Sequence, residues 1–261
     1  MYAVAFLVAF QFGAWPHIRD RGISRQQAEG MLGWTVIAGL VGARLYYDVQ
    51  NNPVHYLTHP QDIFAFWQGG MAFSGAMGAG LLTLGLLARR YHLSFWLLGD
   101  AAALFACIGQ PIGRIGNVIN GDILGQRSPL PWATAYTYPT GMGHCAVLQS
   151  GFVCGVGYQP AAASEALGTL VLLAVLIMLR RRFPTMGGLL TIVYVTGYAL
   201  SQLLIFFLRA SEPVVLFGLK QAQVTGLVVL LVIVPCLIVA WKRSPLSSKV
   251  LAPSQVEALT S

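Results

Sequence analysis

The chain has 261 residues, of which 56% are hydrophobic and only 10% are charged. A soluble domain carries about 25% charged residues, so this composition excludes an ordinary soluble enzyme and indicates a polytopic membrane protein. The net charge of +7 would suit a nucleic-acid partner, but the basic residues stand in short clusters at the ends of apolar runs. Such clusters are the orientation signal of a membrane protein, so we expect no nucleic-acid partner.

Seven apolar segments follow one another, and we interpret each as a transmembrane helix. The second begins with Ser24-x-x-Gln27, a capping-box pattern that opens helices. The segments cover residues 1–15, about 24–48, about 70–88, 94 into 110–122, 160–179, 186–208 and about 223–241. The fold class expected is therefore an all-α membrane protein with seven transmembrane helices.

Basic clusters follow the first, third, fifth and seventh segments. They are Arg19, Arg21 and Arg25, then Arg89-Arg90, Arg180-Arg181-Arg182, and Lys242-Arg243. By the positive-inside rule these ends are cytoplasmic, which places the N-terminus outside and the C-terminus inside. We expect a seven-span membrane domain over 1–243, an extracytoplasmic loop over 121–159, and a disordered cytoplasmic tail over 244–261.

The stretch 110–122, with the sequence QPIGRIGNVINGD, interrupts this apolar pattern. Pro111 is expected to end or kink the fourth helix, because it lacks an N–H and clashes with the preceding turn. Irregular polar backbone survives at membrane depth only where it is buried in protein or lines a wet cavity. A charge there is costly and usually functional, although Arg114 could simply pair with a carboxylate and brace two helices. We expect an irregular polar site at the outer side.

Polar residues of five segments share this outer level under the predicted orientation. They are Arg44 and Asp48, Ser74, Arg114, Asn117, Asn120 and Asp122, Glu165, and Gln202 with Arg209. Scattered structural polar residues would not be expected to share one depth, so the pattern favours a site. Asp100 falls near the inner side, and we interpret it as structural.

Two further patterns allow more than one interpretation. Gly75-x-x-Gly78-x-Gly80 precedes no strand–helix unit, so close helix packing is favoured over a dinucleotide loop; Gly39 and Gly42 are a weaker signal of the same kind. Cys145 and Cys154 share the outer loop, where they form either a disulfide or two free thiols. No motif resembles a metal site.

The motif Gly113-Arg114-Ile115-Gly116-Asn117-x-x-Asn120-Gly121-Asp122-x-x-Gly125 resembles the signature of the bacterial prolipoprotein diacylglyceryl transferase family. Residues 69–75 (GGMAFSG) are similar to a second family segment, and 186–188 leading to Gly197-Tyr198 to a third. The order and spacing of these segments match over nearly the whole chain.

The resemblance implies transfer of a diacylglyceryl group from phosphatidylglycerol to the lipobox cysteine of a prolipoprotein signal peptide. The family works at the outer face of the bacterial plasma membrane, and we expect no cofactor. Arg114, Asn117 and Gly125 match positions of its important set. Glu165 matches an acidic residue early in the fifth span, and Asp122 stands where the family usually has glutamate.

Our mechanistic hypothesis is that Arg114 holds the lipid phosphate, Asn117 and Asn120 orient head-group oxygens, and a carboxylate takes the thiol proton. The expected catalytic residues are Arg114, Asp122 and Glu165. The expected substrate-binding residues are Arg114, Asn117, Asn120, Gly125, Ser74, Gln202 and Arg44.

The chain departs from the family pattern at several positions. Ser74 replaces the loop histidine, Gln202 and Phe206 replace an arginine and a glutamate of the sixth span, and Gln159-Pro160 replaces a histidine-proline pair. These replacements motivate a second hypothesis, a non-catalytic relative that binds anionic lipid or a lipoprotein precursor. A transporter is a third, against which no inverted repeat is visible.

Overall fold

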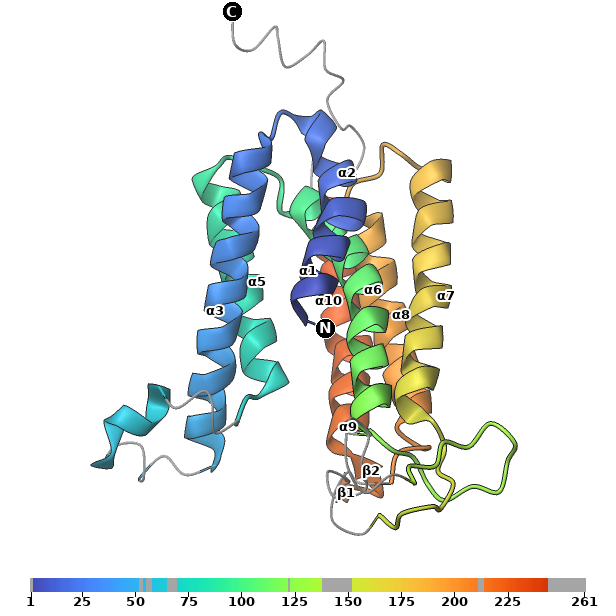
Figure 1. The fold of residues 1–261 in the computed structure, drawn as a ribbon. Coiled ribbons are helices and arrows are strands. Elements are labelled where there is room, and N and C mark those ends of the chain that lie inside the picture. The colour runs from blue at the N-terminus through green and yellow to red at the C-terminus, as the bar shows by residue number, and fades with distance from the viewer. Residues whose placement is uncertain are drawn as a thin grey trace, which may run out of the picture. The chain divides into compact units, whose positions relative to one another are not determined.

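The computed structural model is mostly helical and describes residues 2–51, 54, 58–64, 70–121, 123–137, 152–210 and 214–243. The chain divides into two compact units, which are described separately below (Figure 1). One unit comprises Ile18–Leu98, and the other Met1–His17 with Gly99–Ser261. The predicted tail, 244–261, lies outside the described residues.

Three helices in the described ranges are long and apolar enough to cross a membrane. They are α6 (Phe95–Asn120), α7 (Ala161–Arg182), and the continuous helical run Gln221–Arg243. A further apolar helix, α8 (Leu189–Ile205), has 17 residues. These helices confirm a helical membrane protein, and the seven-span count and orientation stay predictions.

The Ile18–Leu98 unit is built on α3 (Arg25–Asn51) and α5 (Phe73–Arg90), which lie side by side (Figure 1). The predicted capping box is confirmed at the start of α3. The Ser24 N–H donates to Gln27 Oε1 at 3.0 Å, and the Gln27 N–H donates to Ser24 Oγ at 3.2 Å. A short 3-10 helix, η3 (Pro60–Phe64), lies between the two long helices in the chain.

The contact between α3 and α5 depends on two glycines. A Cβ on Gly75 would lie 2.2 Å from the Gly42 carbonyl oxygen, and one on Gly42 would lie 2.3 Å from the Ala79 Cβ. The helices therefore approach more closely than any side chain would permit, as small residues allow in membranes. The packing role predicted for the glycine-rich run is confirmed at Gly75, whereas a Cβ on Gly78 would meet nothing within 4 Å.

We expect Gly75→Ala to lower the midpoint of thermal unfolding, because the added methyl group forces the two backbones apart. Overpacking of this kind costs about 1–3 kcal/mol. Gly78→Ala, on the same helix but facing open space, is the matched control and should unfold at or above the wild-type temperature. Equal midpoints for the two variants would contradict this account of the α3–α5 contact.

Arg44 holds the segment between α3 and α5 in place. Its Nε lies 3.3 Å from Asp48 Oδ1 and donates to the Ile63 carbonyl oxygen at 3.0 Å. Its Nη2 and Nη1 donate to the carbonyl oxygens of Asp62 and Gly70, at 2.5 and 3.3 Å. Arg44 is 3% exposed, so the observed contacts are those of a structural brace, and its binding of substrate stays a prediction.

The other unit begins with a helical run made of α1 (Tyr2–Ala9), η1 (Phe10–Ala14) and α2 (Trp15–Ile18). The short helix that follows in the chain, η2 (Arg19–Arg21), belongs to the Ile18–Leu98 unit. The other unit continues with α6, α7 and α8 and ends in α9 (Gln221–Val228), η6 (Val229–Ile233) and α10 (Val234–Arg243). Its core contains Leu104 and Cys107 of α6, Leu176 of α7 and Leu190 of α8. A two-stranded antiparallel hairpin, β1 (Val214–Leu216) and β2 (Leu219–Lys220), joins α8 to α9 and is an addition to the predicted all-α fold.

The buried Asp100 fixes the start of α8. Its Oδ2 accepts a hydrogen bond from the Gly188 N–H at 2.7 Å, and its Oδ1 accepts from the Thr191 N–H and hydroxyl at 2.8 and 2.7 Å. A carboxylate at a helix N-terminus satisfies open N–H groups and matches the positive end of the helix dipole. These contacts fit the structural interpretation of Asp100.

Of the two effects expected of Pro111, an end to the fourth helix is wrong, and a kink stays a prediction. The helix α6 runs from Phe95 through Pro111 to Asn120, so the Arg114 signature is helical where irregular backbone was expected. Such prolines are tolerated in membrane helices because neighbouring groups compensate for the lost hydrogen bond. The helix ends instead at Gly121, whose φ of 76° gives the left-handed turn that closes helices, with its N–H donating to the Asn117 carbonyl oxygen at 2.9 Å.

Candidate functional site

An ion pair between α6 and α7 forms the centre of the candidate site. Arg114 Nη2 lies 2.5 Å from Glu165 Oε2, and Arg114 Nη1 donates to Asn117 Oδ1 at 3.3 Å. The Glu165 side chain is 2% exposed and that of Arg114 is 25% exposed. The guanidinium therefore joins a buried carboxylate on one side and keeps an accessible face on the other.

A second guanidinium lies on the other oxygen of the same carboxylate. Arg209 follows α8, and its Nη1 lies 3.9 Å from Glu165 Oε1. Its guanidinium also lies 4.5 Å from the centre of the Phe206 ring, a favourable cation–π arrangement. Two cations and one anion leave this cluster with one formal positive charge, which favours an anionic ligand.

Aromatic residues of α8 border the cluster. Tyr194 and Tyr198 stack with ring centres 5.7 Å apart, and Tyr198 interacts electrostatically with Arg114, Glu165 and Arg209. Gln110 Nε2 donates to the Tyr194 hydroxyl at 2.9 Å. Tyr194, Tyr198 and Gln202 are spaced four residues apart, so they share one face of α8. Gln202 lies one turn beyond Tyr198.

The loop after α6 approaches the cluster through Gly125. Gly125 forms an antiparallel bridge with Arg209, and the neighbouring Gln126 N–H donates to the Leu208 carbonyl oxygen at 2.8 Å. A Cβ on Gly125 would lie 2.6 Å from the Gln159 Cβ and 2.7 Å from the Leu208 carbonyl oxygen. Only glycine fits without moving these segments, so Gly125 positions the backbone that carries Arg209.

We expect Gly125→Ala to displace the Leu208–Arg209 backbone and to reduce transfer activity by roughly tenfold or more, since misplacing a catalytic group by about 1 Å can cost 10²-fold. The measurement is lipid transfer to a lipobox peptide at equal amounts of folded protein. Gly155→Ala is the control in the same loop, because a Cβ there would meet nothing within 4 Å. Gly155 has a φ of 74°, a left-handed conformation that strains an alanine. The Gly155→Ala control is therefore compared with Gly125→Ala in activity and not in stability. Wild-type activity in Gly125→Ala would contradict the positioning role.

Four other predicted site residues stand at the end of α6, shortly after it in the sequence, and in the Ile18–Leu98 unit. Asn120 ends α6 and is exposed, while Asp122 lies outside the described residues. Ser74 is in the first turn of α5, with its side chain outside the described part, and Arg44 shares its unit. In the loop after α6, Cys154 is disulfide-bonded, which excludes a free thiol there; Cys145, the partner in the disulfide alternative, lies outside the described residues.

The sequence does not by itself identify Arg209 and Tyr198 as site residues. The signal that the sequence offers for Arg209 is its predicted depth in the membrane, which is the same as that of Arg114. Tyr198 stands at helical spacing from Tyr194 and Gln202, which was a weaker signal because such rows are common in helix cores. In the described ranges, no group of three or more His, Cys, Asp or Glu side chains could hold a metal ion.

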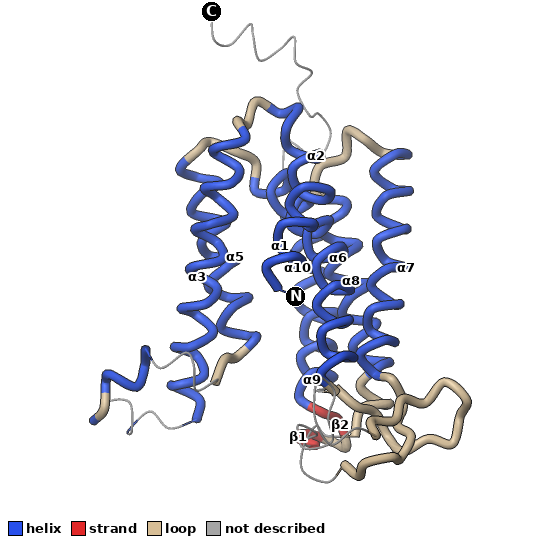
Figure 2. Tube along the Cα trace, in the orientation of Figure 1, coloured by secondary structure: helices blue, strands red, loops and turns tan. Residues whose placement is uncertain are grey.

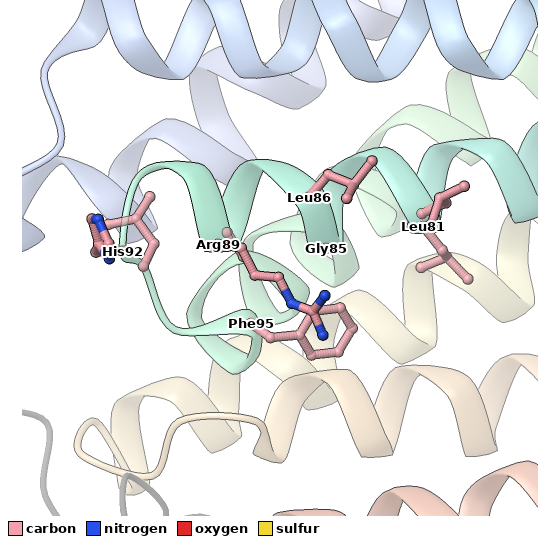
Figure 3. A pocket seen from close by; sticks show the side chains of 9 residues that line it. Leu81, Gly85, Leu86, Arg89, His92 and Phe95 are labelled. Atoms are coloured by element: carbon pink, nitrogen blue, oxygen red, sulfur yellow. The ribbon is translucent and has the colours of Figure 1, made fainter.

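The described surface is hollowed at two other places. A groove of about 620 Å³ lies along the end of α5 in the Ile18–Leu98 unit (Figure 3). Its lining includes Leu81, Leu86, Arg89 and Phe95, with His92 at the end opposite Leu81. A second hollow of about 530 Å³ lies on α7 near Arg181 and Arg182. Neither is lined by Arg114 or Glu165, so the site rests on the charge cluster and not on these hollows.

Comparison with known proteins decides the family. A family model described as prolipoprotein diacylglyceryl transferase matches residues 1–239. The chain belongs to this family. The resemblance seen in the Arg114 signature is thereby confirmed.

Three curated proteins named phosphatidylglycerol–prolipoprotein diacylglyceryl transferase illustrate the similarity. The one from Synechococcus elongatus is 34% identical over 80% of this chain and 71% of its own length. The one from Frankia casuarinae is 33% identical over 97% of this chain and 59% of its own length. The one from Cupriavidus metallidurans is 29% identical over 92% of this chain and 86% of its own length.

Proposed function

We propose that this member of the prolipoprotein diacylglyceryl transferase family transfers a diacylglyceryl group from phosphatidylglycerol to the lipobox cysteine of a prolipoprotein. Its partners are then an anionic membrane lipid and a precursor signal peptide. The family match over residues 1–239 supports the activity. The single structural observation that carries the proposal is the Arg114–Glu165–Arg209 cluster, with its one net positive charge.

The reaction takes place at the outer face of the bacterial plasma membrane in this proposal. Seven spans cross the membrane over residues 1–243, with the N-terminus outside and the C-terminus inside. The basic clusters at the ends of alternate spans support this orientation. The loop 121–159 is then extracytoplasmic, which fits the oxidised state of Cys154.

Arg114 binds the lipid phosphate. It is the most accessible charged group of the cluster, with 25% of its side chain exposed against 2% for Glu165 and 11% for Arg209. A guanidinium pairs well with phosphate oxygens through two parallel hydrogen bonds. Asn117 and Asn120, three and six residues further along α6, orient the head-group oxygens.

Glu165 and Arg209 position Arg114. The buried carboxylate holds both guanidinium groups, so neither has to be reorganised when the phosphate arrives. Gly125 keeps the Arg209 backbone in place through its bridge. Glu165 would lose its ion pair with Arg114 if it accepted a proton. We therefore assign the thiol proton to Asp122, which comes two residues after the end of α6 in the sequence.

The bond changes balance without a further reactant. The cysteine thiol gives its proton to the Asp122 carboxylate, and the thiolate sulfur attacks the diacylglyceryl carbon that bears the phosphate. A sulfur–carbon bond forms as the carbon–oxygen bond to phosphate breaks, and the pair of electrons leaves with glycerol phosphate. Arg114 stabilises the negative charge that develops on this leaving group.

The test is incubation of the purified full chain in nanodiscs with glycerol-labelled phosphatidylglycerol and a lipobox peptide. We expect a thioether-linked diacylglyceryl group on the peptide cysteine and release of labelled glycerol phosphate. A cysteine-to-serine peptide is the control for the acceptor. A folded preparation that binds lipid but yields neither product would overturn the activity and favour a non-catalytic relative, as the replacements at Ser74, Gln202 and Phe206 had suggested.

A further inference from the structure

The hairpin between α8 and α9 carries an exposed apolar tip. Residues 214–219 read VVLFGL and include no charged residue. Val214, Val215, Leu216 and Phe217 are 62%, 61%, 48% and 94% exposed. Adjacent exposed apolar side chains of this kind mark an interaction surface.

The turn of the hairpin holds its aromatic residue in an unfavourable backbone conformation. Phe217 has a φ of 48° and Gly218 a φ of 78°, so both central residues are in the left-handed region, as in the primed turns of two-residue hairpins. Asparagine or glycine would be easier to accommodate than a bulky side chain at the first position. A strained residue that is also exposed motivates a functional explanation.

The base of the hairpin is fixed to the neighbouring helices. Lys220 Nζ donates to the Phe206 carbonyl oxygen at 2.8 Å and also to that of Arg209. The Lys220 N–H donates to Gln223 Oε1 at 3.0 Å, and Gln223 Nε2 donates to the Leu203 carbonyl oxygen at 3.1 Å. Gln223 is 1% exposed, so the apolar tip projects from a rigid, hydrogen-bonded base.

The position of the hairpin identifies what covers the tip. Its second strand ends at Lys220, and the apolar run able to cross a membrane begins at the next residue, Gln221. Its first strand follows the apolar helix α8. Figure 2 shows the hairpin at the same end of α6, α7 and α8 as the loop segments after α6. The apolar tip therefore stands between an apolar helix and a helical run that is able to cross a membrane, at the level where lipid begins.

We propose that residues Val214–Phe217 insert into the lipid leaflet on the Arg114 side of the membrane. The partner is the bilayer itself, with Phe217 among the acyl chains or at their boundary with the head groups, where aromatic side chains are favoured. The inserted tip anchors Lys220, and through it the backbone carbonyl of Arg209, at a fixed depth. The proposal does not depend on the transfer activity, because insertion is a property of the surface alone.

Site-directed fluorescence in nanodiscs tests this proposal. Phe217→Cys and, separately, Val215→Cys are labelled with an environment-sensitive maleimide dye in a full-length Cys236→Ser background. Val215→Cys leaves the strained turn intact, so a folding defect in the first variant does not prevent the test. The exposed Arg127→Cys in the loop after α6 is the matched aqueous control, and the Cys236→Ser parent gives the labelling blank.

Quenching by lipid-borne nitroxide and by aqueous iodide separates the outcomes. We expect lipid quenching at 217 and 215 to exceed that at 127 by roughly threefold, and iodide quenching to be weaker by a similar factor. Iodide quenching equal to that at 127 would overturn the proposal. Protection from iodide without lipid quenching would also overturn it, because the tip would then be covered by protein.

Discussion

Replacing Arg114 by alanine is expected to lower kcat/KM for diacylglyceryl transfer by about 10²–10³-fold, the usual loss when one preorganised donor to a developing negative charge is removed. The structure gives the reason. Arg114 is the accessible guanidinium of a cluster whose carboxylate already orients it at 2.5 Å, so the phosphate loses its most accessible cation. Initial rates with labelled phosphatidylglycerol and a lipobox peptide provide the measurement.

Two comparisons make the Arg114 result specific. Arg114→Lys keeps the charge but not the planar pair of donors, so it should retain more activity than alanine and still fall well below wild type. Arg127→Ala removes an exposed arginine from the loop after α6 and should be close to wild type. If Arg114→Ala remained folded and transferred lipid at the rate of Arg127→Ala, the assignment of the phosphate to Arg114 would be wrong.

Glu165→Gln is expected to have the second largest effect, on stability and on activity together. The substitution leaves two guanidinium groups facing a neutral amide in a buried place. Breaking a buried ion pair from one side costs about 3–5 kcal/mol, and the partial exposure of Arg114 puts this case near the lower figure. The midpoint of thermal unfolding and the transfer rate should both fall.

A double variant separates the positioning role of Glu165 from a role as the base. Glu165→Gln combined with Arg209→Gln removes one negative and one positive charge, so it should recover part of the stability lost in Glu165→Gln alone. If Glu165 only positions Arg114, the double variant should also recover part of the transfer rate. A double variant as stable as wild type but with no more activity than Glu165→Gln would instead indicate that Glu165 takes the thiol proton.

Local features of the sequence were predictable because they need few partners. The Ser24–Gln27 capping box is complete within four residues, and both of its hydrogen bonds are present. The placement of Arg114 and Glu165 at one level of the membrane followed from a depth argument based on the alternating basic clusters. That argument needed no distances, and the observed ion pair agrees with it.

Features that depend on a particular neighbour could not be predicted from the sequence. In the sequence Gly42 is a weaker packing signal than the run at Gly75, yet in the structure these two glycines face each other and leave no space for a side chain at either position. Arg209 joins the site only because the chain reverses after α8 and meets Gly125 in an antiparallel bridge. Pro111 tends to end helices, but α6 continues on both sides of it. The helix is closed instead by the left-handed turn at Gly121.

Photocrosslinking with phosphatidylglycerol that carries a diazirine on its head-group glycerol tests the central claim most directly. After illumination of the full chain in nanodiscs, we expect peptide mapping to place the adducts on the segment of α6 around Arg114 and Asn117, with excess unlabelled phosphatidylglycerol competing for the site and Arg114→Ala abolishing the signal. Adducts confined to other surfaces, such as the groove beside Arg89 and Phe95, and unchanged in Arg114→Ala, would contradict the account.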